Sequence, residues 1–366
     1  MKVLYVAHYR EDSGWGEAAR NYILAMDKVG IDVVCRPIVF QNNAILPDRI
    51  KELERKSYPK YDFCIQNVLP HHFEWSNTYK AVIGQFVTET VGIRHTSWAS
   101  KIKMMDGTLF PFNHVPYNQF GLFLKNVGII PHALDTEDLL KKRPPLEINE
   151  LKDKFTFYYI GEFNRRKNVG ALLRAFHTEF HPNEPVSLVL KMNKPGVSPN
   201  QLGSDINSFC NEIKSGLRLY SNLDSYHQEV LISHRLSRED LIRLHYTCNC
   251  FVTSSFGEAS CIPAHEAAVI GNQVVAPDYG PFRDLLTTNN NTLLANCSTQ
   301  PLIAGEKTFP GFSTAREKWH VVDVADLAYK MRIAFNTLKG LKSYAYEDFS
   351  YENIGNKILK YLENLT

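Results

Sequence analysis

Short apolar runs alternate with amphipathic stretches along the first third of the chain. The runs are rich in β-branched and aromatic residues, as buried strands are, and they cover residues 2–8, 31–40, 61–68, 81–87 and 127–131. The amphipathic stretches at 16–29 and 47–56 have the spacing of helices. Strands separated by helix-length segments pair in parallel and use the helices as crossover connections. The pattern therefore predicts an α/β domain.

The alternation stops between residues 135 and 154 and then resumes. The run from Lys141 to Pro145 is charged and ends in two prolines, which suits a linker between domains. Helices are predicted at 168–180 and 263–270, and another begins at Ser237, a residue type that caps helices. The second half is therefore predicted to form a second doubly wound domain. Its predicted strands are 155–160, 186–192, 229–232 and 250–253.

Two later stretches depart from this alternation. Residues 287–319 are rich in Asn, Thr, Pro and Gly and are too long for an ordinary connection, so we expect a loop excursion. Residues 351–365 have apolar residues at helical spacing and predict an amphipathic helix. We accordingly expect domains at 1–147 and 148–340, followed by a C-terminal segment at 341–366.

Length and charge fit two domains and limit the partners. The 366 residues exceed what one hydrophobic core usually organises. The 41 Lys and Arg residues nearly balance the 39 Asp and Glu residues, so the chain has no overall attraction for nucleic acid. No window approaches the roughly 18 to 20 apolar residues of a membrane span. We expect no transmembrane segment, which leaves peripheral contact with a membrane open.

The cysteines indicate a reducing compartment. There are seven, an odd number scattered along the chain, which favours free thiols and a cytoplasmic location. The short apolar start ends at His8 without a cleavage site, so we expect a strand and not a signal peptide. Cys248 and Cys250 are expected to be buried thiols, because no second pair at metal-binding spacing accompanies them.

The stretch 256–268 carries the most informative chemistry. It follows a predicted strand, passes through small residues and enters a helix at Pro263, where the missing N–H costs nothing. Free N–H groups at such a helix start form an anion site suited to a phosphate. Glu258 precedes the helix and Glu266 lies about one turn inside it, so two carboxylates flank the expected phosphate. The amides expected to bind this phosphate are those of Ser260, Cys261 and Ile262.

A Glu, seven residues and a second Glu, with a Pro between them and an Ala pair after them, resemble the signature of the retaining family 4 glycosyltransferases. Those enzymes have the GT-B architecture, two Rossmann-like doubly wound domains that face each other across a cleft. The resemblance implies that Glu258 contacts the transferred sugar and Glu266 the ribose of the nucleotide. The family's usual aromatic-glycine pair is here Ser260-Cys261, which bears on the shape of the loop. Two solvated carboxylates at a helix end are the alternative.

A second match to this family lies where the first strand of the second domain gives way to a helix. The family holds the donor phosphates there with a Gly and basic residues, and the resemblance assigns these roles to Gly161, Arg166 and Lys167. Fixed cations stabilise a departing nucleoside diphosphate more in the transition state than in the ground state. Many members have Arg after the Gly, whereas this chain has Glu162, so Arg165 or Arg166 would replace it. An exposed basic cluster without a role is the alternative.

Gly14 and Gly16 follow the first strand and open a helix. Alone, they match the weak fingerprint of a dinucleotide-binding loop, which would indicate an NAD-dependent oxidoreductase. The glycines do not abut the strand, however, and no acid ends the second strand. The resembled family has a comparable glycine loop that faces the cleft near the donor diphosphate. A plain tight turn is the third interpretation.

Three residues of the first domain are candidates for contact with the acceptor. Glu89 follows a buried strand at the edge where open α/β sheets bind ligands. His95 and Trp98 follow it closely in sequence. Other histidines are expected to be ordinary helix or loop residues, namely His71, His72 and His265.

The resemblance implies a retaining hexosyltransferase that moves a hexose from a nucleoside diphosphate sugar to a glycan or other hydroxyl acceptor, as in polysaccharide biosynthesis. Glu258, Arg166 and Lys167 would act in catalysis, and the final helix would cross back to the first domain. No Asp-x-Asp pair follows a strand, so transfer without a metal or another cofactor is expected. The sequence leaves open a UDP or GDP type of donor, the acceptor, the linkage and the oligomeric state. A non-catalytic nucleotide-sugar or glycan-binding protein is the alternative.

Overall fold

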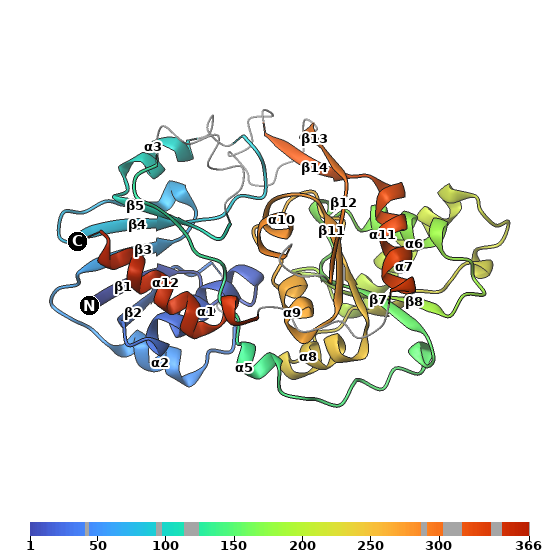
Figure 1. Cartoon of the computed structure of the whole chain (residues 1–366), viewed down its shortest axis with the longest axis horizontal. Coiled ribbons are helices and arrows are strands. Elements are labelled where there is room, and N and C mark those ends of the chain that lie inside the picture. The colour runs from blue at the N-terminus through green and yellow to red at the C-terminus, as the bar shows by residue number, and fades with distance from the viewer. Residues whose placement is uncertain are drawn as a thin grey trace.

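Two six-stranded parallel sheets, each with helices packed against it, form the two halves of the molecule (Figure 1). The computed structural model describes residues 1–40, 44–92, 97–112, 124–286, 291–302, 317–337 and 346–365. Among them, no helix has the length and apolar character needed to cross a bilayer. The two sheets confirm the predicted α/β class with two doubly wound domains.

The first sheet has the strand order β2-β1-β3-β4-β5-β6, with every neighbouring pair parallel. All residues of its third and fourth strands are buried, as expected for a sheet that is covered on both faces. Its strands are β1 (Lys2–Ala7), β2 (Asp32–Pro37), β3 (Phe63–Asn67), β4 (Ala81–Gln85), β5 (Gly107–Phe110) and β6 (Val127–Ile129). The helices of this domain are α1 (Gly14–Lys28), α2 (Asp48–Arg55) and α3 (Trp98–Met104).

The second sheet has the order β12-β11-β10-β7-β8-β9 and is also parallel throughout. Its strands are β7 (Phe155–Glu162), β8 (Val186–Asn193), β9 (Val230–Ile232), β10 (Cys250–Val252), β11 (Gln273–Pro277) and β12 (Thr292–Ala295). Its helices are α6 (Val169–Glu179), α7 (Pro199–Leu217), α8 (Arg238–Thr247), α9 (Ile262–Ile270), α10 (Gly280–Leu286) and α11 (Val324–Asn336). Short 3-10 helices lie at Pro70–His72, Asn149–Leu151, Arg165–Lys167, Leu223–Ser225 and Tyr346–Phe349.

Capping interactions fix the starts of α1 and α8 and the end of α9. The side chain of Ser13 accepts from the Gly16 amide at the start of α1, and that of Ser237 accepts from the Asp240 amide at the start of α8. Gly271 ends α9 in the left-handed region at φ 100°, directly after Ile270, the last residue of the helix.

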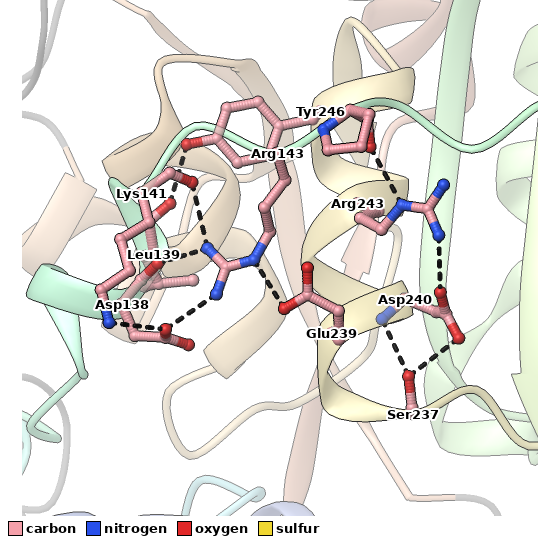
Figure 2. Close-up of polar contacts among 10 residues, drawn as sticks. Asp138, Leu139, Lys141, Arg143, Ser237, Glu239, Asp240, Arg243 and Tyr246 are labelled. Carbon is pink, nitrogen blue, oxygen red and sulfur yellow. Dashed lines mark hydrogen bonds and ion pairs between the residues drawn. The ribbon is translucent and has the colours of Figure 1, made fainter.

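The charged segment between the two sheets lies against the second domain. It contains the short helix α5 (Thr136–Leu139). The Arg143 guanidinium contacts Asp138 at 2.7 Å and Glu239 of α8 at 2.8 Å (Figure 2). Arg243, also on α8, donates to the Pro144 carbonyl at 3.0 Å. The linker is therefore held by α8.

The last helix, α12 (Tyr351–Glu363), packs on α1 of the first domain (Figure 1). Its apolar residues Ile354, Ile358 and Leu362 are part of the same buried cluster as β1 and α1. A Cβ atom at Gly355 would lie 2.2 Å from the Ala25 carbonyl oxygen, so the two helices approach too closely for a larger residue. The end of the chain thus completes the core of the domain that begins it.

The loop excursion expected at 287–319 is wrong for the strands at 292–295, 297–301 and 318–319, while residues 287–290 and 303–316 lie outside the described residues. Strand β12 lies inside it and extends the second sheet by pairing in parallel with β11. It is followed by an antiparallel hairpin of β13 (Cys297–Pro301) and β14 (Lys318–Val322). The residues of β13 are mostly exposed and polar, so they lack the apolar alternation from which a strand is predicted.

Candidate active site

Three of the predicted charged residues meet where β7 and β10 end. These strands are parallel neighbours, so the loops after them lie side by side. The Lys167 ammonium contacts the Glu258 carboxylate at 2.6 Å. The Arg166 guanidinium contacts the same carboxylate at 3.3 Å and donates to the Gly257 carbonyl at 2.6 Å. The structure therefore brings together the three side chains expected to act in catalysis.

The two loops hold each other through the backbone. The Phe256 amide donates to the Arg166 carbonyl at 2.9 Å. Asn168 has left-handed backbone at φ 48°, its side chain donates to the Ser254 carbonyl at 3.1 Å, and its own carbonyl accepts from the Ser254 hydroxyl at 2.7 Å. The basic turn and the acidic loop are therefore positioned before any ligand binds, which lowers the cost of ordering them.

Glu258 is a buried carboxylate that stays ionised. It is 6% exposed. Burial raises its pKa, but the charges of Lys167 and Arg166 and the hydrogen bonds of Lys167 and Ser255 outweigh burial, so the pKa lies below its usual value. Glu258 is thus suited to accept hydrogen bonds and to stabilise positive charge, and not to donate a proton.

Glu89 of the first domain also reaches this cluster. Its carboxylate lies 2.9 Å from the Arg166 guanidinium. Burial raises the pKa of Glu89, and the charge of Arg166 opposes that rise. A Cβ atom at Gly257 would lie 1.8 Å from the Glu89 carbonyl oxygen, so only glycine allows the two loops to come this close.

The hairpin adds a further contact between the domains. Val91 and Lys318 exchange two backbone hydrogen bonds of 2.9 and 2.8 Å. The cavity left between the domains has a volume of about 20 Å³, little more than the space for one water. The cavity is lined by Thr88, Glu89, Thr90, Val91, Phe112, Gly257, Glu258, Tyr279, Gly280, Pro281 and His320.

Glu266 lies in a separate ionic cluster. Its carboxylate contacts Arg238 at 2.5 Å and lies 3.4 Å from the His245 ring, and Arg238 also lies 3.4 Å from Glu17 of the first domain. Burial raises the pKa of Glu266, but Arg238 and His245 outweigh burial and lower it to about 2. In the described part of the chain, Glu266 makes no hydrogen bond or ion pair with the Glu258 cluster.

The loop between the two acids has the backbone that a glycine would give. Cys261 has φ 63° and ψ 65°, in the left-handed region that glycine adopts without strain. Cys261 thus holds, with a side chain, a backbone conformation that favours glycine. Helix α9 begins at Ile262, one residue before the predicted Pro263. Within the described chain, no hydrogen bond is donated by the predicted phosphate-binding amides of Ser260, Cys261 and Ile262.

The remaining predicted positions are dispersed. Gly161 lies within β7, and Gly14 is the first residue of α1. A Cβ atom at Gly16 would lie 2.1 Å from the Glu11 carbonyl oxygen, so this glycine allows a close backbone approach. Trp98 is buried in the first domain. His95 lies outside the described residues.

Arg238 was missed as a candidate by the sequence analysis, which took it only as part of a helix start. A cation in the first turn of a helix is disfavoured by the helix dipole, because that end carries partial positive charge. The acids Glu239 and Asp240 of the same turn offset that cost, so no local pattern pointed to the contact of Arg238 with Glu266.

No protein-family model matches the chain, and no curated protein does either. Solved structures do. Sucrose-phosphate synthase from Thermosynechococcus elongatus is 13% identical with a TM-score of 0.60, and the match covers 100% of this chain and 94% of that one. A glycosyltransferase from Rickettsia africae is 12% identical with a TM-score of 0.63, and the match covers 100% and 98%.

A third similar structure is that of HepE from Anabaena, in complex with UDP and glucose. It is 12% identical with a TM-score of 0.57, and the match covers 100% of both chains. At such low identity the likeness concerns the fold. The chain has the GT-B fold of these proteins, with two parallel α/β domains whose strand ends face each other.

Proposed function

We propose that this chain is a glycosyltransferase that takes a hexose from a nucleoside diphosphate sugar and transfers it with retention to a hydroxyl group of a glycan. The observation that carries the proposal is the meeting of Arg166, Lys167 and Glu258 beside the start of α9. A helix start with free amides and two adjacent cations binds a diphosphate. A buried, ionised carboxylate beside that diphosphate can accept hydrogen bonds from the attached sugar and stabilise positive charge that develops on it.

The proposed mechanism assigns each residue of this cluster a role. As the bond between sugar and diphosphate breaks, negative charge grows on the phosphate, and Arg166 and Lys167 stabilise it. Glu258 accepts hydrogen bonds from the sugar and supports the positive charge that develops on the sugar ring. The leaving phosphate takes the proton of the attacking hydroxyl on the same face, which retains the configuration. No residue of the chain is needed as a base in this scheme, and no metal is invoked.

Glu266 is proposed to bind the ribose hydroxyls of the donor. In the present arrangement its two oxygens face Arg238 and His245. A carboxylate has about four lone pairs, so it can hold a ribose hydroxyl while it keeps one cationic partner. Separation of the domains would remove Glu17 from Arg238 and make this side of α9 accessible.

The base of the donor is proposed to be uracil, as in the UDP complex of the HepE structure. We also propose that the protein acts in the cytoplasm in polysaccharide biosynthesis. All seven of its cysteines are free thiols, which supports a reducing compartment. The interpretation as an NAD-dependent oxidoreductase gains no support. A Cβ atom at Gly16 would lie 2.1 Å from the Glu11 carbonyl oxygen, so this glycine serves a close contact within the chain and not the approach of a dinucleotide.

A thermal-shift screen with UDP, GDP and ADP in the presence of EDTA tests the proposal. A ligand that binds only the folded chain raises its melting temperature, and we expect UDP to give the largest rise. Hydrolysis of UDP-glucose measured with the wild type and with Glu258→Gln separates an enzyme from a binding protein. We expect hydrolysis by the wild type and about 10²-fold less by the variant. Binding without hydrolysis by either protein would favour the non-catalytic alternative.

A further inference from the structure

A buried lysine lies near the carboxyl end of the second sheet, outside the ionic clusters described above. Lys191 is on β8, where it pairs with Ile160 of β7 on one side and with Ile232 of β9 on the other. Ile232 is the last residue of β9, and only Met192 and Asn193 follow Lys191 in β8. Paired residues of parallel strands point their side chains to the same face of a sheet, so two apolar side chains flank Lys191.

The Lys191 ammonium has few partners. The residue is 6% exposed, and its ammonium donates to the Met192 carbonyl at 3.4 Å, which is long for a hydrogen bond. Within the part of the chain that the structure describes, no carboxylate forms an ion pair with it. Burial lowers the pKa of Lys191, and no neighbouring charge opposes this shift. Two of the three ammonium hydrogens therefore lack an acceptor among the described residues.

Lys214, another buried lysine of the second domain, has the partner that Lys191 lacks. Lys214 is 1% exposed, and its ammonium contacts the Glu229 carboxylate at 2.7 Å. A buried cation without such a partner destabilises the folded chain. Residues that conflict with stability in this way are expected at functional sites, where a ligand supplies the missing partner. Folding alone thus gives no reason for a lysine at position 191.

The order of the strands places Lys191 on one side of the proposed diphosphate position. The basic turn follows β7 and helix α9 follows β10, whereas β8 and β9 lie on the other side of β7. Glu266 of α9, the proposed ribose ligand, contacts Arg238, the first residue of α8, and α8 follows β9. A nucleoside that extends from the diphosphate past Glu266 therefore directs its base toward the ends of β8 and β9.

The chemistry of the ammonium limits what it can bind there. An ammonium donates hydrogens and accepts none, so its partner must present an acceptor. Uracil presents carbonyl oxygens, as thymine does, whereas adenine has no carbonyl and its exocyclic amino group is a donor. The flexible four-carbon stem of a lysine lets the ammonium turn from the Met192 carbonyl to such an oxygen. The apolar side chains of Ile160 and Ile232 suit the flat face of a base.

We propose that Lys191 donates to a carbonyl oxygen of the donor's base and thereby makes the site prefer UDP over ADP. This role in specificity rests on the proposed function and deepens it. The phosphates are held by Arg166 and Lys167 in either nucleotide, so Lys191 affects only the recognition of the base.

Calorimetric titration of the full chain with UDP, ADP and pyrophosphate, all in EDTA, tests this inference. The variant is Lys191→Met, which has an unbranched apolar side chain. The control is Lys194→Met, because Lys194 directly follows β8 but is exposed, with its ammonium 5.7 Å from the Phe163 ring. We expect the wild type and Lys194→Met to bind UDP about tenfold more tightly than ADP. We expect Lys191→Met to bind UDP about tenfold more weakly than the wild type and to keep its affinity for ADP and pyrophosphate.

Urea unfolding without ligand separates this role from a structural one. Lys191→Met removes a buried cation that lacks an acidic partner, so its unfolding midpoint should be equal to or higher than that of the wild type. A lower midpoint would mean that the lysine supports the fold, and it would contradict the inference.

The inference is overturned if Lys191→Met binds UDP as tightly as the wild type does. It is also overturned if UDP and pyrophosphate lose affinity together, since Lys191 would then belong to the phosphate site. UDP binding by the wild type without a preference over ADP contradicts this inference alone. Failure of the wild type to bind either UDP or pyrophosphate contradicts the proposed function, and the inference with it.

Discussion

The two sheet edges that face each other in this molecule share a topology but not a chemistry. At the edge of the second sheet, Arg166, Lys167 and Glu258 form a buried ionic cluster beside a helix start. At the edge of the first sheet, the rings of His8 and Phe40 form an aromatic stack with centroids 4.7 Å apart. Parallel strands place loops at one edge, and the loop residues decide what binds there. The cations of the ionic cluster favour an anionic ligand at the edge of the second sheet.

Removing a cation from the ionic edge should have the largest effect. In Arg166→Ala, the departing diphosphate loses a fixed charge, so we expect the transfer rate to fall by about 10²–10³-fold. Arg165→Ala is the matched control, since Arg165 is an exposed neighbour on the same turn. Initial rates with UDP-glucose measure both. Equal loss in the two variants would show that charge near the turn matters and its position does not.

The second ionic cluster should make the chain sensitive to acid. Glu266 has a pKa lowered from 4.5 to about 2, so its stabilising contribution is complete above pH 4.5 and is lost as the pH falls toward 2. In Arg238→Ala we expect a loss of about 1–2 kcal/mol at neutral pH and a smaller further loss on acidification.

Urea unfolding of the wild type and of Arg238→Ala between pH 7 and pH 3 measures this difference. Phe40→Ala serves as the comparison from the aromatic edge, and it should keep the wild-type dependence on pH. An unchanged acid response in Arg238→Ala would contradict the assigned cause of the low pKa.

The contact between the two edges should oppose donor binding. The Glu89 carboxylate lies 2.9 Å from the Arg166 guanidinium, the group that is proposed to hold the diphosphate. Glu89→Gln weakens this pair, and we expect UDP to bind about three- to tenfold more tightly. Glu137→Gln is the control, because Glu137 forms an exposed ion pair with Lys28. Calorimetric titration measures both affinities, and weaker binding of UDP to Glu89→Gln would instead make Glu89 part of the donor site.

The smallest effect concerns the loop of the ionic edge. Cys261 has left-handed backbone that costs a residue with a Cβ atom more than it costs glycine. Cys261→Gly should therefore stabilise the fold by about 0.5–1 kcal/mol in urea unfolding. Cys261→Ala keeps the Cβ atom and should not stabilise it. A gain in both variants would assign the effect to loss of the thiol.

The sequence predicted the ionic edge better than the aromatic one for a physical reason. Two motifs that resemble those of a known family singled out Arg166, Lys167 and Glu258, and the parallel pairing of β7 with β10 brings the two motifs together. His8, Phe40 and His72 lie on separate segments that meet only when the sheet forms, and the sequence analysis treated His72 as an ordinary loop residue. The order of the strands, which brings such segments together, is not encoded in any local pattern.

The same limit explains the other misses. Apolar periodicity predicted the two α/β domains because their central strands and covering helices are strongly patterned. It missed β13, whose exposed residues carry no such pattern. The partner of Arg238 could not be predicted, since Glu266 lies on a different helix and their contact depends on how α8 and α9 pack.

The central claim is that a nucleoside diphosphate binds at the start of α9 against the basic turn. Calorimetric titration of UDP into the wild type and Lys167→Ala, both in EDTA, tests it most directly. Lys167 contacts Glu258 in the structure, and it is proposed to hold the diphosphate when donor is bound. We expect saturable binding by the wild type and at least about tenfold weaker binding by the variant. Equal affinity of the two proteins for UDP would contradict it.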